Sequence, residues 1–134
     1  MIILDTHIWI WWIHKDKQLP PAAFDWIESI PPNRRFVSIV SCWEVAKLIA
    51  KRRLKLEQPL DEWINGATVG AGLRIFNLTP QICIEANFLP GDFHNDPADQ
   101  MIVATTRVLG GSLATADGKI LQYPHVPLAP MRFY

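Results

Sequence analysis

The feature that most constrains the fold of this chain is a short apolar run at its start that ends in a carboxylate. Residues 2–4 read I-I-L and are followed directly by Asp5. An apolar run without alternation is typical of a strand buried on both faces, as in a parallel sheet covered by helices. The carboxyl end of such a strand lies at the edge where open α/β folds bind their ligands. Asp5 is therefore a candidate for chemistry, although a helix cap explains one isolated acid equally well.

Predicted strands alternate with predicted helices along the rest of the chain. Further strands are expected at residues 35–40, 73–78 and 112–115, with a last apolar stretch at 126–128. Helices are expected at residues 8–13 (with Thr6 as N-cap), 21–30, 41–53, 59–70, 79–88 and 96–109, with a helical turn at 119–121. This alternation predicts an α/β fold with a central parallel sheet and helices on both faces. The length of 134 residues fits one domain spanning residues 1–134.

The composition limits the partners and the compartment. Lys and Arg number 13 and Asp and Glu number 13, so the net charge is zero and a polyanion must be held by a local basic patch. Cys42 and Cys83 form neither a disulfide framework nor a CxxC metal pair, which fits a cytoplasmic protein. The apolar run at 8–13 is too short to span a membrane, so we expect no membrane partner.

Four acidic residues occupy equivalent positions in this pattern. Asp5 and Asp117 follow predicted strands, whereas Glu44 and Asp99 lie in the first turns of predicted helices. Each alone has a capping explanation, and Ser41 with Glu44 matches the S-x-x-E capping box. A parallel sheet, however, brings all four to one edge, where like charges about 4 Å apart repel by roughly 4 kcal/mol per pair at an effective dielectric constant of about 20. A cation or a bound proton must offset this repulsion.

The ligand types at this edge indicate which cation would bind. Carboxylate oxygens are the ligands that Mg²⁺ and Mn²⁺ prefer. His7 and His94 are the nearest histidines, and neither belongs to an HxxxH or HExxH pattern, so a zinc site is disfavoured. Carboxylate-held Mg²⁺ pairs are a common device for cleaving phosphodiesters.

A series of lysines follows Glu44 on the same predicted helix. Lys47, Lys51 and Lys55 are spaced by four residues, so they form a basic stripe if the helix persists. Such a stripe is either a groove for a nucleic-acid backbone or merely a solvated face. Because Lys47 lies about one turn after Glu44, we expect Lys47 and Lys51 to bind phosphates of a nucleic-acid backbone.

Four short motifs are spread along nearly the whole chain. They are I-I-L-D-T-H-I-W-I-W-W at 2–12, S-C-W-E at 41–44 before a Lys-rich helix, F-H-N-D-P-A-D-Q-M-I-V-A-T at 93–105, and L-A-T-A-D at 113–117. Together they resemble the PIN-domain family, and within it the VapC-type toxins of type II toxin–antitoxin pairs. The resemblance implies a three-layer α/β/α fold with a central parallel sheet. It also implies a Mg²⁺- or Mn²⁺-dependent endoribonuclease that a small cognate antitoxin inhibits.

The resemblance also implies roles for particular residues. The four acids of the family fall on Asp5, Glu44, Asp99 and Asp117, which would be catalytic and bind the metal, with Asp5 and Asp99 the most direct ligands. Residues of second rank near the site are Thr6, His94, Asp96 and Thr115. Gln100 departs from the pattern, because relatives often have Arg after the second Asp of the D-P-x-D pair. That departure concerns contacts with substrate and leaves the metal residues intact.

Other families that begin with a strand and an acid fit less well. A haloacid-dehalogenase-like phosphatase needs a second Asp where this chain has His7. A receiver domain needs an acceptor Asp after the third strand, where Thr79 and Pro80 follow. A dinucleotide-binding fold needs a G-x-G-x-x-G motif after the first strand, which is absent. The alternative that stays open is a non-catalytic RNA- or protein-binding module on the same fold, which loss of any of the four acids would favour.

The helix predicted at 8–13 is apolar on every face. Trp9, Trp11 and Trp12 are spread around it at roughly 100° per residue, so they cannot all point toward the sheet. Exposed aromatic residues mark interaction sites. We therefore predict a homodimer that also binds the antitoxin, with this helix in one of the two interfaces. In the alternative interpretation, the helix at 21–30 covers all three tryptophans.

Overall fold

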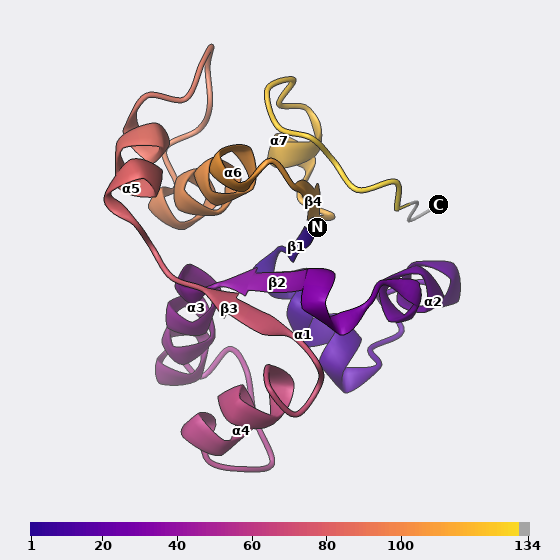
Figure 1. Ribbon diagram of the computed structural model, residues 1–134. Helices are drawn as coiled ribbons and strands as arrows, with labels where there is room; N and C mark the ends of the chain where they lie inside the picture. The colour runs from indigo at the N-terminus through magenta and orange to yellow at the C-terminus, as the bar shows by residue number, and fades with distance from the viewer. Residues whose placement is uncertain (132–134) are drawn as a thin grey trace.

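The fold is built on a parallel sheet of short strands (Figure 1). The computed structural model describes residues 1–131. The strands are β1 (Ile2–Leu4), β2 (Arg35–Ser38), β3 (Arg74–Phe76) and β4 (Ser112–Ala114), in the order β3-β2-β1-β4. Each pairing is parallel, and Ile3 lies beside Phe36 of β2 and Leu113 of β4. The predicted parallel α/β fold is thereby confirmed, with β1 inside the sheet.

Helices cover both faces of the sheet and give the fold its three layers. Helices α1 (Thr6–His14), α2 (Pro21–Ser29), α3 (Ile39–Ala50) and α4 (Leu60–Ala67) lie on one side, and α5 (Pro80–Asn87), α6 (Pro97–Leu109) and α7 (Gly118–Leu121) lie on the other (Figure 1). A 3-10 turn at Pro32–Arg34 precedes β2. Because strand side chains alternate, Ile2 and Leu4 pack with α1 and α2, whereas Ile3 packs with α6. This explains why β1 has no polar residue.

The boundaries of α3 differ from those predicted. The helix begins at Ile39, and the N-cap is Ser38, whose Oγ accepts the N–H of Val40 at 3.1 Å. The predicted capping box of Ser41 and Glu44 is therefore wrong, since both lie inside the helix. The β-branched residues before Ser41 suggested strand, but position in the tertiary structure overrides that weak preference. At its other end α3 stops at Ala50 rather than at residue 53.

Two further local predictions also needed correction. The N-cap of α1 is Asp5 rather than Thr6, and the Asp5 side chain accepts the N–H of Thr6. The stretch at 126–128 forms an isolated parallel bridge between Leu128 and Leu113 rather than a full strand. Within residues 1–131, no helix combines the length and the apolar character that crossing a membrane requires.

The three tryptophans of α1 have different surroundings. Trp9 is fully buried and donates from Nε1 to the carbonyl of Ala67 in α4 at 2.8 Å, whereas Trp12 is buried and donates to Glu28 of α2 at 3.0 Å. Trp11 is only partly buried. The prediction that the three cannot all be buried is confirmed. The alternative in which α2 covers all of them is wrong, because α4 covers Trp9.

Candidate active site

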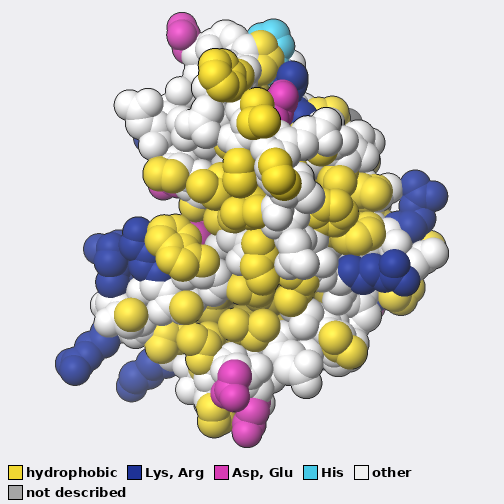
Figure 2. All heavy atoms as spheres, turned by 60° about the vertical axis from the view of Figure 1, so that its left-hand side comes forward, with side chains coloured by type: hydrophobic (Ala, Val, Ile, Leu, Met, Phe, Trp, Pro, Cys, Tyr) yellow, Lys and Arg dark blue, Asp and Glu magenta, His cyan; other side chains and the backbone are white. Residues whose placement is uncertain are grey.

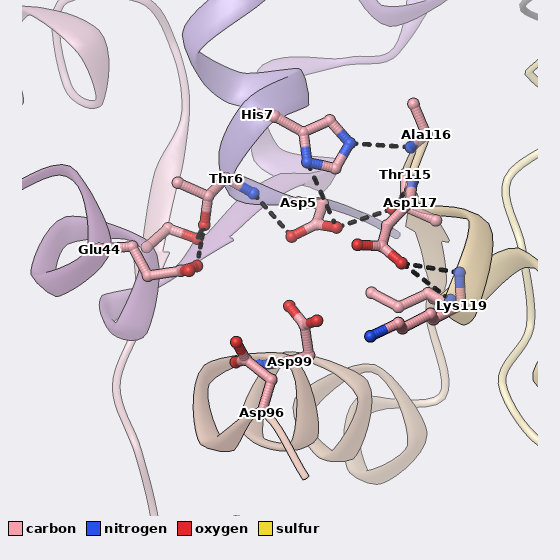
Figure 3. A network of polar contacts seen from close by, with 12 residues as sticks. Asp5, Thr6, His7, Glu44, Asp96, Asp99, Thr115, Ala116, Asp117 and Lys119 are labelled. Atoms are coloured by element: carbon pink, nitrogen blue, oxygen red, sulfur yellow. Dashed lines mark hydrogen bonds and ion pairs between the residues drawn. The ribbon is translucent and has the colours of Figure 1, made fainter. Parts of the chain in front are cut away.

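Asp5 is the most constrained acid of the molecule. It follows β1, and its backbone N–H donates to the carbonyl of Ala114 in β4 at 2.9 Å. Its side chain is buried; Oδ1 accepts the N–H of Thr6 at 2.8 Å, and Oδ2 accepts the hydroxyl of Thr115 at 2.7 Å. Asp5 thus caps α1 and also faces the other acids (Figure 3). The sequence left open whether Asp5 is a helix cap or part of a site, and in the structure Asp5 both caps α1 and faces the other acids.

Hydrogen bonds connect the turn after β4 to the start of α1. Thr115 Oγ1 accepts the N–H of Asp117 at 3.0 Å, while His7 Nε2 accepts the N–H of Ala116 at 2.9 Å. A ring nitrogen that accepts a hydrogen bond carries no proton, so in neutral His7 the proton lies on Nδ1. That nitrogen is 3.7 Å from Asp5 Oδ2. His7 therefore holds the turn after β4 beside Asp5, a role that its place in the D-T-H sequence did not reveal.

Asp117 and Asp99 each lie at the start of a helix. Asp117 caps α7, because its Oδ1 accepts the N–H groups of Lys119 and Ile120 at 2.8 and 3.2 Å. Asp96 caps α6 and accepts the N–H of Asp99 at 3.0 Å. Both helices thereby aim a carboxylate toward Asp5 across the same opening (Figure 3).

Glu44 reaches the same opening from α3. Its Oε1 accepts a hydrogen bond from the hydroxyl of Thr6, which also lies 2.8 Å from Ser41 Oγ. Burial raises the pKa of Glu44; the Thr6 hydrogen bond opposes this rise, and the charges of Asp5 and Asp96 add to it. The side chain is thus held at the edge of the acidic cluster rather than in the capping position that its sequence suggested.

Asp99 is the acid most affected by its neighbours. Its pKa is raised to about 7, first by burial and then by the negative charges of the surrounding carboxylates. In decreasing order of effect, these carboxylates are Asp5, Asp96, Asp117 and Glu44. Nε2 of His94 lies 3.0 Å from Asp99 Oδ2, but the contact lacks the geometry of a hydrogen bond, and among the described residues this buried nitrogen has no other partner. The carboxylate is therefore poorly compensated by the protein itself.

The donor set at this opening fits a divalent cation. It consists of carboxylate oxygens, which are hard ligands, and their mutual repulsion is visible in the raised pKa of Asp99. Within residues 1–131, no three His, Cys, Asp or Glu side chains already stand in ligating geometry around one point. The four predicted acids therefore converge (Figure 3) without forming a closed cage.

The basic residues divide between two hollows. Lys47 and Lys51 line a cleft together with Glu44 and Asp96, on the acidic side of the molecule. Lys55 lines a different hollow with His14 and Trp63. The predicted three-lysine stripe is thus interrupted, because α3 ends before Lys51 and the chain turns away.

Gln100 and Lys119 complete the surroundings of the acids. Gln100 Nε2 donates to the carbonyl of His94 at 3.0 Å, so it holds the loop that precedes α6. Lys119 lines a third hollow, together with Asp99 and Asp117. A positive charge therefore lies beside the acids, at a residue that the sequence motifs had not singled out.

Comparison with known proteins identifies the family. A model of the PIN domain matches residues 2–126. Ribonuclease VapC22 of Mycobacterium tuberculosis is 31% identical over 124 residues, which cover 92% of each chain. The crystal structure of VapBC2 from Rickettsia felis bound to a promoter DNA fragment has a TM-score of 0.72 at 18% identity, covering 96% of this chain and 98% of that one. A toxin–antitoxin complex from Klebsiella pneumoniae has a TM-score of 0.69 at 18% identity, with coverages of 100% and 98%. From its sequence and its fold together, this chain belongs to the PIN domain family.

Proposed function

We propose that this protein is a Mg²⁺- or Mn²⁺-dependent endoribonuclease and the toxin of a type II toxin–antitoxin pair. The observation that carries the proposal is the convergence of Asp5, Glu44, Asp99 and Asp117, with the pKa of Asp99 raised to about 7. Strongly perturbed acids in an open cleft are typical of functional sites. The similarity to a protein named ribonuclease supports the choice of substrate.

In this proposal all four acids help to hold the cation, and the cation in turn binds the substrate. Asp5 and Asp99 are the most direct ligands, and Glu44 and Asp117 complete the set. A divalent cation bound there would activate a water molecule for attack on phosphorus and offset the charge that develops on the phosphate. Thr6 and Thr115 fix the orientation of the carboxylates, as outer partners of metal ligands do. Asp96 sets the start of α6 and thereby the position of Asp99.

The proposed substrate is single-stranded or looped RNA. Lys47 and Lys51 line the cleft next to Glu44, where they can bind phosphates on either side of the cleaved bond. A site made of carboxylates and a cation reads no base, so we propose no sequence preference from these residues. His94, beside Asp99, is in reach of a substrate bound at the acids.

The proposed partners are a small cognate antitoxin and a second copy of this chain. Solved toxin–antitoxin complexes with the same fold support the antitoxin. The partly exposed Trp11 of α1 supports a contribution of this helix to one of the two interfaces. The cytoplasm, where RNA is made and used, is the proposed compartment.

Substitution of the two most direct ligands tests the activity. Asp5→Asn and Asp99→Asn remove a charge while keeping the shape of the side chain. Each should reduce RNA cleavage in Mg²⁺ or Mn²⁺ by more than the roughly 10- to 100-fold expected for an outer partner of a metal ligand. Cleavage of a labelled RNA by purified protein free of antitoxin, with and without excess EDTA, is the measurement.

Asp25→Asn is the matched control, because Asp25 is an exposed acid on α2, away from the acidic cluster. It should cleave at the rate of the unaltered protein. Equal cleavage in excess EDTA would contradict the metal mechanism. RNA that is bound with the same affinity by every variant and cut by none would favour the non-catalytic binding module instead.

A further inference from the structure

Trp43 is an aromatic side chain that the fold leaves in solvent. It is 55% exposed, although tryptophan is a large and mostly apolar residue. It lies on α3 directly before Glu44, which belongs to the acidic cluster. Neither the packing of α3 nor the acid cluster requires an aromatic residue at this position. Its place beside Glu44 puts this exposed ring within reach of a ligand bound at the acidic cluster.

The surroundings of Trp43 are rich in positive charge. The ammonium group of Lys47 lies 4.7 Å from the centre of the Trp43 ring, a distance typical of a cation–π contact that helps to hold the ring. Lys51 and Arg53 line the same cleft. Because the whole chain has no net charge, this concentration of cations is local. In Figure 2, Lys and Arg side chains gather at the left edge of a largely hydrophobic face.

The same cleft continues toward the acids. Its lining includes Glu44 and Asp96, and the charges of both raise the pKa of Asp99. A single strand of RNA that passes the acids would therefore lie beside both an aromatic ring and cations. This is the combination by which proteins hold single-stranded nucleic acids, with bases stacked on aromatic rings and phosphates bound by Lys and Arg.

We infer that Trp43 is the stacking platform for one unpaired base of the RNA, next to the phosphodiester held at the acids. Lys47, Lys51 and Arg53 bind the neighbouring phosphates. The inference rests on the proposed function and adds a base-binding subsite to it. RNA fits this place better than an apolar protein partner does, because three cations and two carboxylates line the cleft.

The test removes the Trp43 ring from the protein and, separately, one base at a time from the RNA. Binding of a labelled single-stranded RNA is measured with Asp5→Asn protein in Mg²⁺, so that the RNA is not cut. An abasic nucleotide is moved through the RNA one position at a time. Trp43→Ala should weaken binding of the intact RNA by about 5- to 150-fold, the range for loss of one stacked base. In protein that keeps Trp43, one abasic position should cost about as much.

The two losses should not add. In the Trp43→Ala protein, the sensitive abasic position should become neutral, because there is no ring for the base to contact. Trp43→Phe should recover most of the binding, since Phe also offers an aromatic face. Phe88→Ala is the matched control, because Phe88 is a 78% exposed aromatic residue at the end of α5, on the other side of the sheet from α3. Phe88→Ala should bind RNA unchanged.

Three outcomes overturn the inference, and they differ from failure of the proposed function. Equal affinity of the Trp43→Ala and parent proteins for intact RNA, in a chain that cleaves RNA normally when Asp5 is present, contradicts the subsite alone. If an abasic nucleotide lowers the affinity equally at every position of the RNA, that result also contradicts the subsite alone. Loss of self-association in Trp43→Ala, with RNA binding intact, assigns the ring to a protein contact. Absence of any RNA binding or cleavage contradicts both the subsite and the proposed function.

Discussion

Single residues at this site have structural and chemical tasks at once. Asp5 caps α1 and is also the buried centre of the acidic cluster. Asp117 caps α7 in the same way. Capping places a carboxylate where N–H groups stabilise its charge, and it also fixes the direction in which the remaining lone pairs point. The starts of α1 and α7 therefore fix the positions of Asp5 and Asp117.

The raised pKa of Asp99 predicts how the metal-free protein responds to pH. An unfolded Asp titrates near pH 3.9, whereas the folded group titrates at about 7. The folded state thus holds more protons between these values, so the free energy of unfolding should fall as the pH rises from about 4 to about 7. Thermal unfolding in EDTA across this range measures the effect.

Asp99→Asn should remove most of this pH dependence and stabilise the metal-free protein at pH 8, because the repelled charge is gone. The variant Asp25→Asn, at an exposed site, should keep the slope of the unaltered protein. An equally steep fall of stability in Asp99→Asn would mean that another group causes it.

At the scale of the element, the ends of α3 decide which side chains reach the cleft. The helix begins after the Ser38 cap, which puts Glu44 in its second turn, facing Thr6. It ends at Ala50, and the backbone of Arg52 has a φ of 56°, in the left-handed region. Because the helix ends and the backbone changes direction there, the four-residue spacing of the lysines no longer places Lys55 on the same helix face as Lys47. Lys55 lines another hollow instead. Of the three lysines in this series, Lys47 and Lys51 line the cleft with the acids.

The double variant Lys47→Ala with Lys51→Ala should weaken RNA binding and reduce its salt dependence. Each phosphate contact with single-stranded nucleic acid contributes about 0.7 to the log–log slope of affinity against salt, so two lost contacts should lower it by about 1.4 units. Binding of labelled RNA over a salt series is the measurement. Lys55→Ala is the control and should leave the slope unchanged. An unchanged slope in the double variant would mean that these lysines form only a solvated face.

At the scale of the whole molecule, the strand order assembles the site. The adjacent strands β2, β1 and β4 end at one edge of the sheet, where α3, α1 and α7 begin, and α6 starts opposite them. Segments far apart in sequence therefore contribute one acid each (Figure 3). The same architecture leaves exposed apolar side chains on α5, namely Ile84 and Phe88. The molecule thus carries apolar surface that a partner could cover.

Of the two proposed interfaces, one with a second copy of the chain and one with the antitoxin, one is predicted to involve Trp11, the partly exposed tryptophan of α1. Truncation of a tryptophan that is an interface hot spot costs at least about 2 kcal/mol, or roughly 30-fold in affinity. Trp11→Ala should therefore weaken either the homodimer, measured by sedimentation, or the complex with the antitoxin, measured by calorimetry. Trp26→Ala is the control, because Trp26 is a similarly half-buried tryptophan on α2. If both variants behave like the unaltered protein in both measurements, α1 lies in neither interface.

The sequence by itself determined the elements and the acids. Apolar runs, proline and glycine positions and capping residues are local signals, so the order of strands and helices and the start of α6 at the D-P-x-D motif could be read directly. The acids could be placed at one edge because parallel strands all end on the same side. These features depend on residues that are neighbours in the chain.

Tertiary structure alone decided how those acids are held and which side chains join them. The bonds of Thr6 to Glu44 and of Thr115 to Asp5, and the contact of His7 with the turn after β4, link residues far apart in the sequence. The burial of Trp9 against α4 is of the same kind. No local pattern encodes such contacts, because their free energy depends on the simultaneous packing of several elements against the sheet.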